Sequence, residues 1–221
     1  MDWQALTLSL KLAALTLVVL LPAGLWLARW MAYTDIAGKS WIEALVVLPL
    51  VLPPTVLGYY LLVSLGGASP LGRFMAQTLG IRLTFNFFGL LLASIVFNVP
   101  FLVQPMQRAF EAIPRQLGEA AAVSGLSAWQ TFWRIELPLA WPGILSAMVL
   151  TFVHTLGEFG VVLMMGGSIP GETKTIAIAI YDRVQAFDLA SADRMALLLL
   201  VFSLGAVGAS FFASARLALK R

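Results

Sequence analysis

The chain has 221 residues, of which 60% are apolar and only 11% are charged, and its mean hydropathy is +0.91. Because a soluble domain carries about 25% charged residues, this composition excludes a cytosolic enzyme, a disordered tail and a secreted disulfide scaffold. The net charge of +3 comes from basic residues that lie mainly between apolar runs, which indicates membrane orientation rather than nucleic-acid binding.

Five apolar runs are long enough to cross a bilayer, since one helical crossing needs about 20 residues. They are expected at about residues 5–28, 44–66, 83–105, 137–160 and 195–216. Helices are the expected form because a backbone in lipid must satisfy its own hydrogen bonds, and the runs lack the alternation of barrel strands. We therefore predict an all-α polytopic membrane protein, with one transmembrane domain over residues 1–221 and a polar loop at 108–136.

The turn after the first run contains AGKS at residues 37–40, which resembles the end of a phosphate-binding loop. That motif requires glycine five residues before its second glycine, and the chain has Tyr33 there. We predict an ordinary turn, so any ATP hydrolysis must come from a partner protein.

The second run is interrupted within residues 48–58, LPLVLPPTVLG, by three prolines and a glycine. Proline removes a backbone donor and kinks or ends a helix, and broken membrane helices tend to line a pathway or to flex. Pro53, Pro54 and Gly58 are therefore candidates for a pathway or gate. The prolines of the other runs are interpreted as bends in a packed bundle.

The polar loop predicts two short helices joined by a tight turn. Pro114 suits the first turn of a helix, and Gly125 suits the left-handed residue that closes it. Ser127 and Gln130 have capping-box spacing, so a second helix should start at Ser127 and run into the fourth span. One face of the first helix collects Leu117, Ala120, Ala121 and Ser124, and the alanines and the serine would let another surface approach closely.

The fourth run carries two polar side chains, His154 and Glu158, which lie four residues apart and so on one helical face. His154 is either a satisfied buried histidine or part of a polar lining. A carboxylate at the bilayer centre costs about 2.5 to 3.5 kcal/mol. Glu158 is either a gate element or a structural hydrogen-bond acceptor, and we expect it to brace the turn at Gly157 and Gly160. In the fifth run the small residues around Gly205 suit close packing, either within one subunit or against a second one.

Basic residues on the two sides of the predicted spans give the orientation. One side collects eight: Arg29, Lys39, Arg108, Arg115, Arg134, Arg216, Lys220 and Arg221. The other side collects five: Arg73, Arg82, Lys174, Arg183 and Arg194. We therefore expect the N-terminus outside the cell, and the C-terminus and residues 108–136 on the cytoplasmic side of the membrane.

The loop resembles the EAA loop of the membrane subunits of binding-protein-dependent ABC importers. All seven defining positions match at the family spacing: Glu119, Ala120, Ala121, Gly125, Ile135, Leu137 and Pro138. The resemblance implies a five-span type I importer permease fold in which this loop is a coupling helix that docks into a separate ATPase subunit. It also implies a homodimer, two cytoplasmic ATPase subunits, an extracytoplasmic oxyanion-binding protein and a location in the plasma membrane, the inner membrane of a bacterium. Because the sequence has no cysteine, one histidine and no nucleotide-binding motif, we expect no cofactor, metal or catalytic residue in this chain.

Two further segments, residues 48–62 and 156–175, are similar to the molybdate permeases and more loosely to the sulfate and thiosulfate permeases. Molybdate is the expected anion, with tungstate, sulfate and thiosulfate as alternatives. A secondary carrier would show an inverted repeat and intramembrane ion pairs, and neither is visible in the sequence. A membrane-embedded enzyme would rest on His154 and Glu158 alone, which is too little for a catalytic site.

Overall fold

The computed structural model describes residues 1–219, which form helices joined by loops. Lys220 and Arg221, two of the residues that we counted for orientation, lie outside the described residues. In chain order the elements are α1 (Trp3–Tyr33), α2 (Lys39–Val51), α3 (Pro54–Leu65), α4 (Pro70–Thr78), α5 (Phe87–Glu111), α6 (Arg115–Val123), α7 (Ala128–Thr131), a π-helical segment η1 (Phe132–Glu136), α8 (Leu137–Gly157), α9 (Gly160–Gly166), α10 (Ile176–Gln185) and α11 (Leu189–Leu219).

Four helical stretches are long and apolar enough to cross a membrane: Trp3–Tyr33, Phe87–Glu111, Ala128–Gly157 and Leu189–Ser214. The pair α2 and α3 also qualifies when taken together, and it is bent by 108°. Residues 1–219 therefore contain four candidate spans, or five if the bent pair counts as one. Several helices continue past the runs read from the sequence, because charge-free runs mark the hydrocarbon layer whereas a helix continues into the polar layer on either side.

The bend between α2 and α3 follows from two consecutive prolines. A residue before proline is pushed out of the helical region, so Pro53 constrains Leu52 and Pro54 constrains Pro53. Both have extended backbones, with ψ of 139° at Leu52 and 134° at Pro53. The single prolines Pro22, Pro49, Pro100, Pro105 and Pro142 all lie inside helices, so only the double proline ends one within a run.

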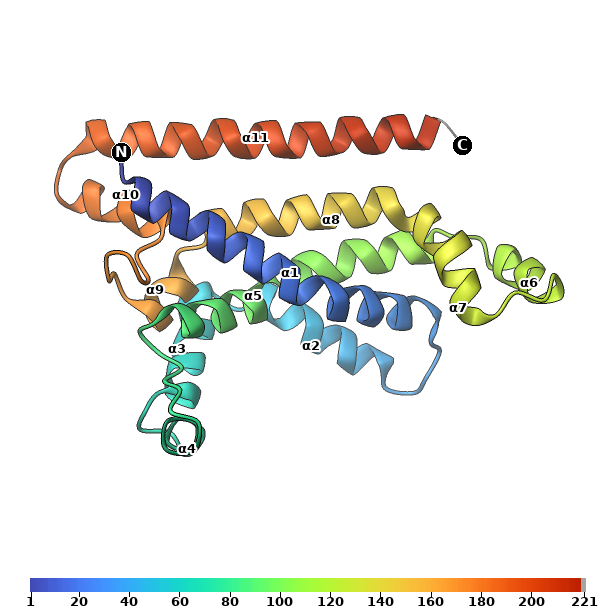
Figure 1. Cartoon of the computed structure of the whole chain (residues 1–221), viewed down its shortest axis with the longest axis horizontal. Coiled ribbons are helices and arrows are strands. Elements are labelled where there is room, and N and C mark those ends of the chain that lie inside the picture. The colour runs from blue at the N-terminus through green and yellow to red at the C-terminus, as the bar shows by residue number, and fades with distance from the viewer. Residues whose placement is uncertain (220–221) are drawn as a thin grey trace.

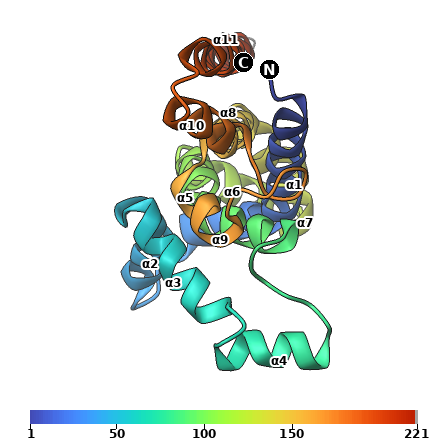
Figure 2. The ribbon, with the colours of Figure 1, turned by 90° about the vertical axis from the view of Figure 1, so that its left-hand side faces the viewer.

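Helix α5 lies at the centre of the bundle and packs against α1, α2, α8 and α9 (Figure 2). Its buried residues Leu102, Met106 and Phe110 join the largest hydrophobic cluster, together with Phe132 and Ile144 of the fourth span. Helix α4 projects away from this body at the tip of α3. The body that holds the functional segments is therefore formed mainly by α1, α5 and α8.

Helix α11 lies along one side of the bundle on α8 and α10 (Figure 1). Its apolar surface is largely exposed, and a Cβ placed on Gly205 or Gly208 would meet no described atom within 4 Å. The small residues that we considered for close packing thus find no partner among residues 1–219. Lipid or a second subunit is left to cover that face.

The two ends of the described chain lie at opposite ends of the bundle (Figure 1). Helix α1 starts at one end, whereas α11 finishes near the end from which α6 and α7 project. An odd number of crossings produces this arrangement, so the bent pair α2–α3 serves as one crossing.

Candidate functional site

The loop at one end of the bundle has the predicted form of helix, turn and helix. Helix α6 closes at Gly125, whose φ is +77°, and the Leu126 N–H donates to the Ala121 carbonyl over 3.0 Å, as in a Schellman motif. The capping box is present: the Gln130 N–H donates to Ser127 Oγ, and the Ser127 N–H donates to Gln130 Oε1. We expected Pro114 in the first turn of this helix. Its backbone is extended, so Pro114 is instead the N-cap and α6 begins one residue later, at Arg115.

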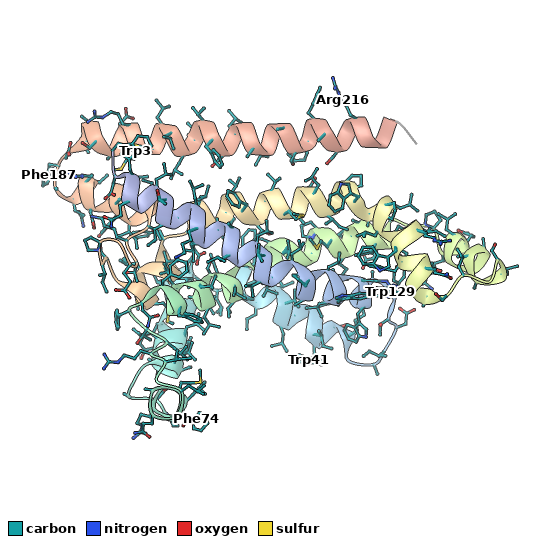
Figure 3. All side chains as sticks on the ribbon, viewed as in Figure 1. Trp3, Trp41, Phe74, Trp129, Phe187 and Arg216 are labelled. Carbon is teal, nitrogen blue, oxygen red and sulfur yellow. The ribbon has the colours of Figure 1, made fainter. Side chains whose placement is uncertain are left out.

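Helix α6 projects from the bundle with almost its whole surface free (Figures 1 and 3). Glu119 and Ala120 are exposed, and Val123 is 90% exposed. Ala121 is the one buried residue of the helix, so it faces the loop rather than a partner. A cleft of about 320 Å³, lined by Glu119 among others, lies between α6 and the start of the fourth span. Such a protruding surface can meet another protein.

The remaining motif residues lie where the loop enters the fourth span. Ile135 belongs to η1, and Leu137 and Pro138 are the first residues of α8. Helices α7, η1 and α8 run without a break from Ala128 to Gly157, so the second half of the loop and the span form one continuous helix that contains a π-helical segment. Beside Ile135, Glu136 forms an ion pair with Arg29 of α1.

The candidates around the double proline contact the segment after the fourth span. A Cβ on Gly58 would lie 2.7 Å from Met164 Cβ, and one on Gly160 would lie 2.9 Å from Pro54 Cβ. Helices α3 and α9 therefore pack at very short range through their glycines, and Pro53 is the N-cap of α3. The structure brings Pro53, Pro54 and Gly58 together with the break that follows Glu158.

His154 and Glu158 meet at a third residue that the sequence reading overlooked, Asn98 of α5. Asn98 Nδ2 donates to Glu158 Oε2 over 3.2 Å, and Ser94 Oγ donates to the same oxygen over 3.0 Å. Because Nδ2 is the donor there, we assign Asn98 Oδ1 as the acceptor of the His154 Nδ1–H bond of 3.0 Å. Glu158 is only 4% exposed, and its Oε1 has no partner among the described atoms. The carboxylate thus bonds to α5, and not to the turn at Gly157 and Gly160 as we expected.

The two groups of candidates lie at opposite ends of the long axis, with α6 at one end and α9 at the other (Figure 1). The comparison with protein families shows in which kind of protein both groups occur. The family described as "Binding-protein-dependent transport system inner membrane component" matches residues 20–221. The chain belongs to this family. It is thus a multi-pass inner-membrane permease of an ABC importer.

Curated relatives of this permease are similar over most of their length. The molybdenum transport system permease protein ModB of Azotobacter vinelandii is 48% identical over 203 residues, which cover 91% of this chain and 89% of that protein. The protein of the same name in Escherichia coli K12 is 39% identical over 184 residues, covering 83% and 80%. A probable sulfate transport system permease protein of Anthoceros angustus is 30% identical over 201 residues, covering 91% and 69%.

Solved structures agree on the fold of the permease. A bacterial ABC transporter involved in the import of alginate matches with a TM-score of 0.76 at 21% identity, covering 96% of this chain and 78% of that one. The MetNI methionine ABC transporter, in an inward-facing conformation, matches with a TM-score of 0.70 at 19% identity, covering 98% and 94%. At these identities the matches support the type I importer permease fold and nothing finer.

The sequence reading did not predict the partners of four polar residues of the permease: Ser94, Asn98, Arg29 and Glu136. Asn98 had a visible signal, because an amide inside a charge-free run is expensive in lipid and needs a partner. Arg29 was counted only as an orienting charge, although it pairs with a residue 107 positions away. Only the fold could reveal that pairing.

Proposed function

We propose that this permease forms the translocation path of an ATP-driven molybdate importer. The main support is the exposed helix α6, which a tight turn joins to the continuous helix of the fourth span, in a chain 48% identical to a molybdenum transport permease. Sulfate, thiosulfate or tungstate remain alternative anions of the same class, since one relative is named as a sulfate permease.

In this proposal α6 docks into a separate cytoplasmic ATPase subunit. Glu119 and Ala120 lie on its exposed surface, while buried Ala121 and left-handed Gly125 keep the helix short and the turn tight. Ile135, Leu137 and Pro138 then carry a displacement of the loop into the fourth span. Two copies of this chain and two ATPase subunits form the core of the complex, with the N-terminus outside and the C-terminus in the cytoplasm.

The gate of the proposed path lies where α3 and α9 touch, at Pro53, Pro54 and Gly58. Near this contact, the side chains of Glu158 and His154 bond to α5 and so anchor the end of α8. A carboxylate repels a dianion, so we assign these two residues to support of the gate rather than to contact with the anion. An extracytoplasmic binding protein selects the anion, because a path that must release a dianion cannot also hold it tightly.

The proposal is tested with the permease, its ATPase and its binding protein reconstituted in liposomes that contain ATP. We expect uptake of labelled molybdate that requires ATP and the binding protein, and competition by tungstate. Uptake of molybdate by the permease alone would contradict the assignment. So would a complex whose ATP hydrolysis is raised by sulfate and by no other anion.

A charge reversal tests the docking role. Glu119→Arg should leave membrane insertion unchanged but weaken co-purification with the ATPase and lower uptake, because the exposed carboxylate lies on the docking surface. Glu172→Arg, an exposed residue of the α9–α10 loop, is the matched control. Unchanged co-purification and uptake in Glu119→Arg would remove this residue from the interface.

A further inference from the structure

Arg29 and Glu136 form a two-bond ion pair between α1 and the end of the π-helical segment η1. Arg29 Nε–H donates to Glu136 Oε2 over 2.5 Å, and Nη2–H donates to Oε1 over 3.1 Å. The Glu136 side chain is 10% exposed, the least of any carboxylate that forms an ion pair within residues 1–219. Two charge-assisted bonds in a sheltered place fix direction as well as distance.

Aromatic rings hold the guanidinium of Arg29 in position. Its central carbon lies 6.0, 5.6 and 5.5 Å from the ring centres of Trp26, Tyr33 and Phe132. Trp26 also stacks on Phe132 at 4.8 Å, so the end of α1 and η1 share one aromatic cluster. Aromatic rings from both helices therefore lie beside the guanidinium that pairs with the carboxylate, and they help to hold its orientation.

The pair lies between the projecting loop and the membrane spans. The cleft of about 320 Å³ under α6 is lined by Ile113 to Arg115, Gly118 and Glu119 on one side, and by Tyr33, Thr131, Ile135 and Glu136 on the other. Helix α6 is thus connected to the bundle by the segment before it, which follows α5, and by the segment after it, which leads through α7 and η1 into α8. A π-helical turn is an irregular element that often marks a functional site, and here it could bend under load.

We propose that Arg29 and Glu136 are positioning residues that clamp η1 to α1, so that a displacement of α6 moves α1 and α8 together and is not absorbed in the π-helical turn. The proposal rests on the proposed function, because it assigns the coupling route of that same loop. Without the ion pair, α6 can still dock, yet its movement reaches α8 only through an unsupported turn and reaches α1 weakly.

The test uses the complete reconstituted importer and measures ATP hydrolysed per molybdate imported. Arg29→Gln and Glu136→Gln should each raise that ratio by at least about fivefold, the low end of typical coupling between two sites, while co-purification with the ATPase stays normal. The variant with both substitutions should be no worse than either single one, because residues that act as one unit are non-additive. Arg183→Gln, which removes the exposed pair with Asp188 at the other end of the bundle, is the control.

Each outcome separates this proposal from the proposed function. An unmodified complex that does not import molybdate refutes the proposed function. Normal import with an unchanged ratio in both single variants, or additive effects in the double variant, overturns the clamp alone. If both glutamine variants fail to assemble, Arg29→Lys keeps the charge without the two-bond geometry. Failure of that variant to assemble, or its assembly with an unchanged ratio, would assign the pair to folding and overturn the proposal.

Discussion

At the residue scale, the polar cluster of Ser94, Asn98, His154 and Glu158 shows how a carboxylate is held among membrane helices. Glu158 Oε2 accepts two hydrogen bonds from α5, whereas Oε1 accepts none from described atoms. No cation lies among its hydrogen-bonding partners in the part of the chain that the structure describes. The geometry therefore favours a structural acceptor over an ion-pair partner.

Glu158→Gln and Glu158→Ala separate the hydrogen bonds from the charge. The amide keeps an oxygen for Ser94 and Asn98 and removes an uncompensated charge, so Glu158→Gln should retain stability and uptake. Glu158→Ala loses both bonds and should destabilise the permease by about 1 kcal/mol. Thermal unfolding in detergent and uptake in liposomes measure the two effects. A large loss of uptake in Glu158→Gln with normal assembly would show that the charge itself is needed at the gate.

Asp188 supports a second residue-scale prediction, at the start of α11. Hydrogen bonds from the Ser191 side chain and backbone lower the pKa of Asp188, and Arg183 lies 3.2 Å from its Oδ2. Because the folded pKa is depressed, this carboxylate stabilises the fold at neutral pH, and its contribution is lost as pH falls below about 4.

Asp188→Asn should therefore lower the Tm at neutral pH, and the difference from the unmodified permease should shrink on acidification. Thermal unfolding over a pH series checks the trend. Asp193→Asn, an exposed change within α11, is the control. A difference in Tm that stays constant over the whole series would show that the charge of Asp188 does not contribute.

At the element scale, the bend between α2 and α3 depends on two features acting together. The double proline sets the angle, and the glycine contacts with α9 fix where α3 rests. Neither feature alone fixes the position of α3. The prolines set the direction of the chain but make no attachment to another helix, and glycines allow close contact only where two helices already meet.

Gly58→Ala tests the contact. The new Cβ would meet Met164 Cβ at 2.7 Å and Val161 Cα at 3.1 Å, and a backbone atom cannot turn aside as a long side chain can. We expect a loss of about 1 to 3 kcal/mol in stability, as for other overpacked sites, measured by thermal unfolding. Gly205→Ala in α11, where the Cβ meets no described atom within 4 Å, should not destabilise. Equal stability of the two variants would contradict the close α3–α9 packing.

Local rules account for what the sequence could predict, and long-range contacts account for the rest. The turn at Gly125 and the capping box at Ser127 depend on residues three to five positions apart, and both are confirmed. The Arg29–Glu136 pair joins residues 107 positions apart, and the bond between Asn98 and Glu158 joins residues 60 positions apart. The π-helical segment depends on how its helix packs. The spacing of residues along one helix does not show which other helix will pack against it.

At the scale of the whole molecule, the chain divides into two working ends joined by a packed middle. One end holds α6 and the Arg29–Glu136 ion pair, the other holds the break between α8 and α9, and α5 contacts the helices between them. The proposed orientation assigns the first end to the cytoplasm. The clamp and the gate would then act from opposite faces of the bilayer.

Single cysteines test that orientation, since the chain contains no cysteine. Val123 at the end of α6 and Phe187 before α11 are each 90% exposed, so a thiol at either position would be accessible. A membrane-impermeant thiol reagent should label Phe187→Cys on intact cells, and Val123→Cys only after the membrane is opened. The reverse pattern would invert the topology and move the coupling loop outside.

Because α6 buries only Ala121, the proposed docking surface is almost independent of the hydrophobic core. Substitutions at the exposed positions of this helix should therefore leave the packing of the membrane helices unchanged. The same independence makes residues 115–125 a natural place for exchange between importers. If α6 docks as proposed, a hybrid that kept Ala121, Gly125 and the Arg29–Glu136 pair should work with a different ATPase subunit while keeping its own path for the anion.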